Sequence, residues 1–400
     1  MSVLTTTAAR AMSRCGARTA FRFVAGVAIA LASSTSLQAD GTWNNAYGNP
    51  GLNNNVNAAV SYFGQLTVAG TFTQAGGAAA NRIARWDGAT WLPLASGVGS
   101  AVNTMIVFGA ELIVAGNFTT AGGAPANRIA RWNGTTWSAM GSGFDNQVFG
   151  LTIFDGKLIA CGQFLNSGAT PILRIAEWDG ANWTQVGAGF NNTTRSVTVF
   201  NNELHAAGIF TASGDLIRLR IARWDGALWQ ALSTGLVGTP EVLTTYAGQL
   251  VVGGSVLQAG GLTVSNIAQW NGTVWSTFGG GLGGGVNTLV EYNGDLIAGG
   301  AFTSAPGANA AILLNRVARW NGAEWTQLGG ACMNGNVEAL TIFNDALIAA
   351  GAFASADAVL TGRIANFVES GATCTGDLDG SGTVGPSDLG ILLGGWGPCQ

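Results

Sequence analysis

The residues best suited to chemistry form a run of oxygen-bearing side chains near the end of the chain. A twelve-residue calcium loop takes its ligands from positions 1, 3, 5, 7 and 12 and needs glycine at position 6 for a sharp bend. Counted from Asp377, the sequence supplies an oxygen at each of these positions and Gly382 at the bend. The predicted Ca²⁺ ligands are Asp377, Asp379, Ser381, the backbone carbonyl of Thr383, and Asp388.

Two features of this loop set its expected strength. Asp388 stands where strong sites carry a bidentate glutamate, and Ser381 replaces an acid, so we expect a dissociation constant of ~10⁻⁴ M or weaker. Cys374 and Cys399 bracket the loop, and a disulfide between them would stabilise so small a unit by roughly 3–4 kcal/mol. The alternative is an acidic, glycine-rich disordered tail with two unrelated thiols.

Catalytic side chains elsewhere in the sequence are few. His205 is the only histidine and stands where related segments carry Ile or Val, so it is interpreted as a local replacement within a strand. One histidine excludes a copper site that needs two, and leaves a Ser-His-Asp triad only one possible base. The sequence therefore predicts no catalytic residues and no site for an organic cofactor.

An internal repeat determines the fold, because the phrase W-[DN]-G-x-x-W recurs along most of the chain. Its first tryptophans are spaced 46 residues apart four times and then 50 apart, the longer interval containing an insertion at 305–314. They are Trp86, Trp132, Trp178, Trp224, Trp270 and Trp320. An R-I-A-R segment precedes most of them, as at 82–85.

Each unit predicts four short strands. In the second unit these are 102–108, 111–118, 128–132 and 135–140, with a glycine-rich loop at 121–125. Asn133-Gly134 predicts a tight hairpin between the last two strands, with both turn residues at positive φ. Four strands at this period describe a β-propeller blade.

The ends of the repeat region give the number of blades. A seventh R-I-A segment, at 363–367, lacks the hairpin and the fourth strand that follow the other copies. At the other end of the repeat region, Asp40-Gly41-Thr42-Trp43 matches the start of such a fourth strand but has no preceding strands of its own. We therefore predict a seven-bladed, all-β propeller whose N-terminal strand completes the last blade, which removes the open sheet edges. The predicted boundaries are a signal peptide at 1–39, the propeller at 40–368, a linker at 369–372 and the tail at 373–400.

The double glycines and late tryptophans make residues 40–368 resemble kelch-like propellers, and also the repeats of fungal cortical cell-polarity marker proteins and of related bacterial secreted propellers. The tail, with an EF-hand-type calcium loop and a short exiting helix, resembles one half of a dockerin, closest to the GC-type dockerin-like segments. The resemblance implies a cell-surface or cohesin-like partner for the tail. A full dockerin has two such loops and this chain has one.

Residues that recur in every unit are interpreted as structural. The arginines at one repeated position are expected to brace neighbouring blades or bond turn carbonyls, rather than to converge as in sialidases; they are Arg82, Arg128, Arg174, Arg220, Arg316 and Arg363. The recurring tryptophans favour interblade packing over carbohydrate stacking. Cys161 is expected to be a small buried residue, and Cys332 to lie in an interblade link.

The N-terminus and the charge balance indicate export. Four arginines and no acid precede an apolar stretch at 23–32 and a small-residue run ending at Ala39, the order of a cleaved signal peptide, with an uncleaved anchor helix as the alternative. Cleavage would change the net charge from −4 to −8, and Lys157 is the only lysine, so nucleic acid is excluded as an expected partner. No transmembrane span is expected in the mature chain.

Two functions follow from these observations. The favoured one is a non-enzymatic, secreted or surface-bound propeller that binds a protein or glycan and is anchored or assembled by its Ca²⁺-loaded tail. The alternative is a polysaccharide hydrolase or lyase that uses acids from Glu241, Glu291 and Asp215. Two acids converging in one mouth would favour the enzyme, and an apolar or plainly polar mouth would favour binding.

Overall fold

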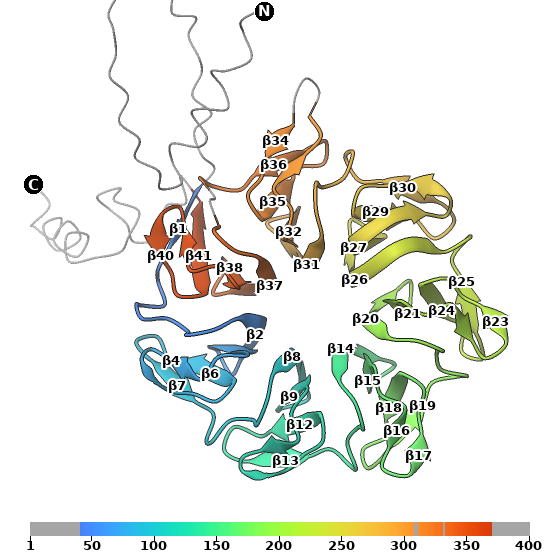
Figure 1. Cartoon of the computed structure of the whole chain (residues 1–400), viewed down its shortest axis with the longest axis horizontal. Coiled ribbons are helices and arrows are strands. Elements are labelled where there is room, and N and C mark those ends of the chain that lie inside the picture. Colours follow the sequence, from blue (N-terminus) through green and yellow to red (C-terminus); the bar gives the residue numbers. More distant parts are fainter. Residues whose placement is uncertain (1–40, 308–310, 331–332, 370–400) are drawn as a thin grey trace, which may run out of the picture.

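A computed structural model describes residues 41–307, 311–330 and 333–369 of the chain. This part is all β and contains no helix that could cross a membrane. Seven antiparallel sheets surround a central axis, each with its first strand innermost (Figure 1). The predicted seven-bladed propeller is confirmed.

The blades are numbered from the N-terminus, and their strands run outward from the axis. Blade 1 contains β2 (Val56–Tyr62), β3 (Gln65–Gly70), β6 (Ile83–Trp86) and β7 (Trp91–Pro93). Blade 2 contains β8 (Val102–Phe108), β9 (Glu111–Gly116), β12 (Ile129–Trp132) and β13 (Trp137–Ala139). Blade 3 contains β14 (Val148–Phe154), β15 (Lys157–Gly162), β18 (Ile175–Trp178) and β19 (Trp183–Gln185). Blade 4 contains β20 (Thr194–Phe200), β21 (Glu203–Gly208), β24 (Ile221–Trp224) and β25 (Trp229–Ala231).

The remaining blades follow the same plan with two variations. Blade 5 has longer inner strands, β26 (Leu236–Tyr246) and β27 (Gln249–Ala259), followed by β29 (Ile267–Trp270) and β30 (Trp275–Thr277). Blade 6 contains β31 (Val286–Tyr292), β32 (Asp295–Gly300), β35 (Val317–Trp320) and β36 (Trp325–Gln327). Blade 7 contains β37 (Val337–Phe343), β38 (Ala346–Gly351) and β41 (Ile364–Glu369), and is completed by β1 (Gly41–Asn44).

The pairing of β1 with β41 closes the ring. Gly41 lies opposite Glu369 and Trp43 opposite Phe367, so the first described strand occupies the outer edge of the last blade. The Trp43 indole is 2% exposed and donates a hydrogen bond from Nε1 to the carbonyl of Leu328, 3.2 Å away. Closure by the N-terminal strand, expected from the Asp-Gly-x-Trp match, is therefore confirmed.

The glycine-rich segment between the second and third strands was expected to be a loop, but it forms a small hairpin in the structure. In blade 2 the hairpin pairs Thr120 with Pro125 across a Gly122-Gly123 turn in which both glycines have positive φ. The equivalent pairs are β4 (Gln74–Ala75) with β5 (Ala78–Ala79), β10 (Thr120–Ala121) with β11 (Ala124–Pro125), β16 (Asn166–Ser167) with β17 (Thr170–Pro171), β22 (Ala212–Ser213) with β23 (Leu216–Ile217), β33 (Ser304–Ala305) with β34 (Ile312–Leu313), and β39 (Ser355–Ala356) with β40 (Val359–Leu360). In blade 5, β28 (Leu262–Thr263) pairs with β27 instead.

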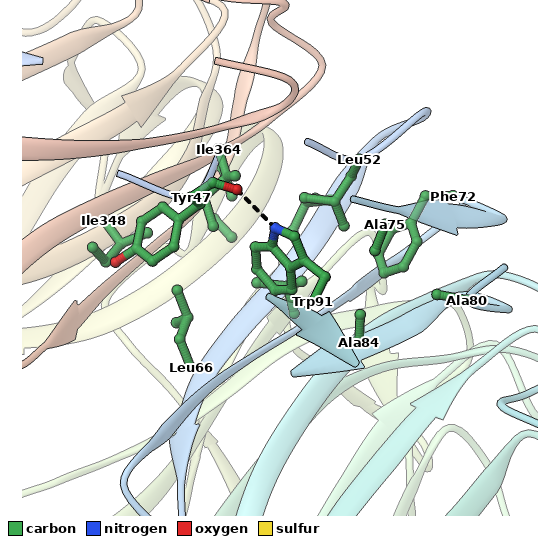
Figure 2. Packing of buried hydrophobic residues seen from close by; sticks show 14 of the residues in the cluster. Tyr47, Leu52, Leu66, Phe72, Ala75, Ala80, Ala84, Trp91, Ile348 and Ile364 are labelled. Atoms are coloured by element: carbon green, nitrogen blue, oxygen red, sulfur yellow. Dashed lines mark hydrogen bonds between the residues drawn. The ribbon is translucent and has the colours of Figure 1, made fainter. Parts of the chain in front are cut away.

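The hydrophobic core lies between blades rather than within one. The second strand of each blade is buried on both faces, as its continuous apolar sequence requires; Leu112 to Ala115 are all 0% exposed. At the seam between blades 7 and 1, Ile348 and Ile364 pack against Leu66 and Tyr47 (Figure 2). Each blade thus depends on its neighbours for burial.

Candidate functional site

The innermost strands bring one side chain from each blade to a common cavity on the axis. The cavity has a volume of about 220 Å³. Its lining comes from the second residue of six innermost strands and from the sixth residue of the longer β26. We call these residues the axial ring; they are Asn57, Asn103, Phe149, Arg195, Glu241, Asn287 and Glu338.

A β-bulge places every residue of the axial ring. In each blade the pairing of the first two strands skips one residue, for example between Val56 and Ala58 and between Pro240 and Val242. The skipped residue is the member of the ring, and the same shift recurs in all seven blades. Bulges of this kind redirect a side chain and recur beside binding sites.

Arg195 is the positive charge of the ring and is held between two of its neighbours. Its Nη1 atom lies 3.2 Å from Oε2 of Glu241, and its guanidinium carbon lies 5.3 Å from the centre of the Phe149 ring. The cation is therefore ion-paired on one side and stacked on an aromatic face on the other.

Glu338 is held by amides instead of by a cation. Asn287 donates from Nδ2 to Oε2 of Glu338 at 2.9 Å, and a side-chain hydrogen bond from Asn336 also lowers its pKa. Burial outweighs both contacts and raises the pKa of Glu338. Burial also raises the pKa of Glu241, and the charge of Glu338 raises it further, although Arg195 acts in the opposite direction.

The three asparagines of the ring fasten it to the blade that follows each of them. Their Nδ2 atoms donate to the carbonyl just before the next ring residue, with distances of 2.8 Å (Asn57 to Val102), 2.9 Å (Asn103 to Val148) and 3.3 Å (Asn287 to Val337). Since a carbonyl oxygen can only accept, each amide is oriented with its nitrogen on the wall. The amide oxygens remain available to a ligand.

Five of the six repeated arginines bond backbone carbonyls, as expected, and Arg316 donates to Oδ1 of Asn336 instead. Arg82 donates from Nη1 to the carbonyls of Thr71 and Phe72 at 3.2 and 3.3 Å, and Arg128 to that of Asn117 at 2.6 Å. The sequence did not reveal that these arginines have positive φ, with values of 66° at Arg82 and 65° at Arg128. None of them lines the axial cavity, although Arg316 bonds Asn336, whose side chain hydrogen-bonds Glu338.

The second tryptophan of each hairpin joins adjacent blades. Trp91 donates from Nε1 to the carbonyl of Tyr47 at 3.0 Å (Figure 2), and Trp183 donates to that of Met140 at 3.1 Å. Trp229 and Trp325 make the same bond to Val186 and Phe278. Interblade packing, the favoured interpretation of the tryptophans, is confirmed.

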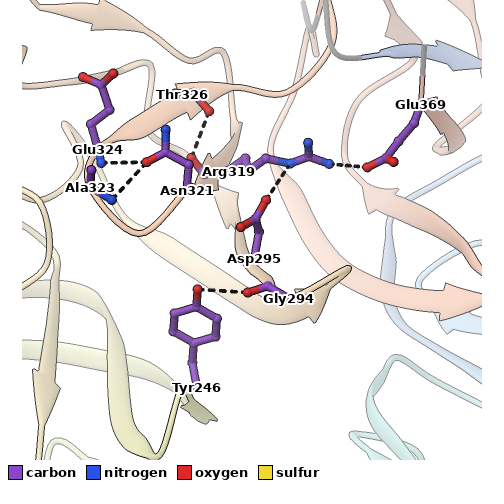
Figure 3. Close-up of polar contacts among 9 residues, drawn as sticks. All are labelled: Tyr246, Gly294, Asp295, Arg319, Asn321, Ala323, Glu324, Thr326 and Glu369. Carbon is purple, nitrogen blue, oxygen red and sulfur yellow. Dashed lines mark hydrogen bonds and ion pairs between the residues drawn. The ribbon is translucent and has the colours of Figure 1, made fainter. Parts of the chain in front are cut away.

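Charged side chains near the rim are occupied by structural contacts. Arg319 pairs with Asp295 at 3.6 Å in its own blade and with Glu369 at 2.6 Å in blade 7 (Figure 3). In blade 3 the charges of the equivalent pair are exchanged, with Nζ of Lys157 lying 2.9 Å from Oε1 of Glu177. The same two positions form an ion pair in blades 2, 3, 4 and 6.

The isolated histidine and cysteine are buried. His205 is 1% exposed in β21, with Nδ1 3.0 Å from the carbonyl oxygen of Glu203, and burial lowers its pKa. Cys161 is 0% exposed in β15, and burial raises the pKa of its thiol. Both match their expected structural roles. Cys332 lies outside the described residues.

Of the three acids named from the sequence, the structure brings only Glu241 to the axial cavity. Glu291 is exposed on β31, and Asp215 is exposed in the turn between β22 and β23. Glu338 was not anticipated. The predicted calcium ligands Asp377, Asp379, Ser381, Thr383 and Asp388 and the predicted Cys374–Cys399 disulfide lie outside the described residues.

A larger hollow of about 510 Å³ lies at the seam between blades 7 and 1. Its acid, Asp87, accepts hydrogen bonds from the backbone amides of Ala89 and Thr90 at 2.9 and 2.7 Å, and these bonds lower its pKa. Trp86 in its wall packs on Trp91. Asp87 and Trp86 are therefore already used in contacts within their own blade, and this hollow is a weaker candidate for a binding site than the axial cavity.

Comparison with known proteins shows the fold and no more. Residues 111–134 match a family described as a β-propeller domain of unknown function (DUF5122), and no curated protein matches. The WD40 β-propeller domain of Doa1 is similar over 85% of this chain and 99% of its own, with a TM-score of 0.50 and 13% identity. The extracellular domain of a hybrid two-component system from B. thetaiotaomicron is similar over 84% of this chain and 40% of its own, with a TM-score of 0.56 and 10% identity. The chain is a β-propeller repeat protein.

Proposed function

We propose that this chain is an exported, non-enzymatic binding propeller that holds its ligand at the axial ring and is anchored by a calcium-binding tail. The observation that carries the proposal is the composition of the ring. The I-A-R-W segments repeat with few changes from blade to blade, whereas the bulge position carries Asn in three blades, Glu in two, Phe in one and Arg in one. Non-repeating side chains on a repeating scaffold are where such proteins carry specificity.

The test of ligand binding compares two variants with the native chain on glycan and peptide arrays. The ring variant carries Arg195→Gln, Glu241→Gln and Glu338→Gln. Its control carries Lys157→Gln and Glu177→Gln, which remove an ion pair on the second and third strands of blade 3. We expect ligands bound by the native chain to be lost from the ring variant and kept by the control. Equal binding by all three proteins would contradict an axial site.

We assign the anchoring role to residues 373–400 on the strength of the loop sequence alone. Cell fractionation of the full chain and of a version truncated after Ser370, each with and without a calcium chelator, tests it. Release from the cell surface by truncation or by chelation supports a Ca²⁺-dependent anchor, formed by the ligands that begin at Asp377. If both forms partition alike in every condition, the anchor is rejected.

A polysaccharide hydrolase is the second candidate, because Glu241 and Glu338 line one cavity and burial raises both pKa values. A carboxylic acid of raised pKa beside a second carboxylate is the pair that glycoside hydrolysis uses. We rank it below binding since Arg195 already engages Glu241. Hydrolysis of a polysaccharide that falls at least about a hundredfold in both Glu241→Gln and Glu338→Gln would reverse the ranking.

A further inference from the structure

The axial ring offers a ligand more acceptors than donors. The amide nitrogens of Asn57, Asn103 and Asn287 already donate to backbone carbonyls. Their three amide oxygens are therefore left to accept hydrogen bonds from a ligand. Glu338 adds a carboxylate that receives amide donors and forms no ion pair within the described strands. A ligand that donates hydrogen bonds therefore matches the ring better than one that accepts them.

The charge of the ring points the same way. One arginine against two glutamates leaves one negative charge in the cavity, and the arginine is already paired with Glu241 and stacked on Phe149. The negative charge that remains is centred on Glu338, between Asn287 of blade 6 and Asn57 of blade 1. A single positive charge on the ligand would neutralise it.

The composition of the cavity favours an organic cation over a metal ion. No group of three or more His, Cys, Asp or Glu side chains in the described residues could hold a metal. The cavity volume of about 220 Å³ exceeds what a bare ion fills. An ammonium group carries one charge and three N–H donors, so it can bond the Glu338 carboxylate and neighbouring amide oxygens together.

We propose that the axial ring binds a primary alkylammonium group, carried by a free amine or by an exposed lysine side chain, with Glu338 as its counter-ion and the ring asparagines as hydrogen-bond acceptors. This inference rests on the proposed function and names the ligand class of the same site. Glu241 stays paired with Arg195 and neutralises that part of the ring. The site is thereby divided between a neutralised half, made by blades 3 to 5, and an acceptor half, made by blades 6, 7, 1 and 2.

The test is calorimetric titration of the mature chain with n-butylammonium, Nα-acetyl-lysine amide, tetramethylammonium, butyrate and Ca²⁺. We expect n-butylammonium to bind with a dissociation constant on the order of 1 mM, the scale for so few ligand atoms. Glu338→Gln should weaken it at least about tenfold, since one charged partner is lost. The control Glu291→Gln removes an exposed acid from the neighbouring strand β31 and should leave it unchanged.

The other ligands separate the ways in which the inference can fail. Binding of the lysine amide as well as butylammonium assigns the site to protein lysines too, whereas binding of butylammonium alone assigns it to free amines. Equal binding of tetramethylammonium, which lacks N–H donors, would reject the acceptor argument. Ca²⁺ binding that depends on Glu338 would replace the amine with a metal.

Two results distinguish this inference from the proposed function. If n-butylammonium does not bind but an array ligand is lost from the ring variant, the ligand class is wrong and the axial site stands. If no ligand of either experiment depends on ring residues, both are overturned. A circular dichroism spectrum and a thermal unfolding midpoint for Glu338→Gln exclude unfolding as the cause of lost binding.

Discussion

Glu338 has an energetic cost that its surroundings do not offset. Burial raises its pKa above the ordinary value for glutamate, despite hydrogen bonds from two asparagines. The folded state then binds the Glu338 proton more tightly than the unfolded state does. Stability contributed by this group is therefore present below the ordinary pKa and falls as the pH rises through the raised one. A carboxylate kept at such a position is typical of a binding site rather than of a scaffold.

This argument predicts that Glu338→Gln stabilises the protein at neutral pH while it removes ligand binding. The amide keeps an acceptor for Asn287 and has no charge to desolvate. We expect the free energy of unfolding to rise at pH 7, by an amount that shrinks as the pH falls to the ordinary pKa of glutamate. Urea unfolding at several pH values measures it. Glu291→Gln, at an exposed position, is the control. A loss of stability at pH 7 would show that the carboxylate is structural.

The axial ring could not be predicted from the sequence, although Glu241 was named for another reason. A side chain reaches the axis because a bulge redirects it, and no residue type marks a bulge at this position. Variability gives no signal either, since Asn57 and Asn103 are identical while the next position, at 58, 104, 150 and 196, differs in all four units. The structure was therefore needed to identify the ring.

At the scale of the element, the sequence predicted the hairpins but not their construction. Asp-Gly was expected to form a two-residue turn with both residues at positive φ. In the structure only Gly88 has positive φ, at 104°, and Trp86 pairs with Trp91 across four loop residues. The Asp87 carboxylate closes this loop by accepting two backbone hydrogen bonds, and Asn321 does the same in blade 6 (Figure 3). The position of the turn was still predicted correctly, because aspartate and asparagine also favour turns that are closed by their own side chains.

The tryptophan contact between blades gives a prediction with an internal control. Nε1 of Trp229 donates to the carbonyl of Val186 at 3.2 Å, whereas the buried Nε1 of Trp275 has no acceptor among the described residues. Replacement by phenylalanine removes a similar area of ring at both positions. We expect Trp229→Phe to cost about 1 kcal/mol more than Trp275→Phe, because only the first loses a satisfied hydrogen bond. Urea midpoints measure the difference, and equal costs would show that packing alone joins the blades.

At the scale of the whole molecule, the repeat together with its two incomplete ends was sufficient to predict seven blades and their closure. Each unit buries its second strand only when it has neighbours on both sides, so the repeat must form a closed ring or expose apolar faces at its ends. The tail could be described from sequence only, because its predicted calcium ligands follow the last described strand. The ligand of the ring required the structure, since it depends on which hydrogen-bonding atoms the scaffold has already used.

Closure of the ring depends on β1, which completes blade 7 by pairing with β41. Trp43 is 2% exposed, packs on Phe367 with ring centres 5.1 Å apart, and donates to the carbonyl of Leu328. Thr42, beside it in the same strand, is exposed. We expect Trp43→Ala to lower the free energy of unfolding by about 3–5 kcal/mol, and Thr42→Ala to change it by no more than about 0.5 kcal/mol. A displaced β1 would also leave the edge of β41 open, so Trp43→Ala should form larger species on size-exclusion chromatography. Urea unfolding of both variants measures the two free energies. Equal stabilities would mean that the ring holds together without the contacts of Trp43 in β1.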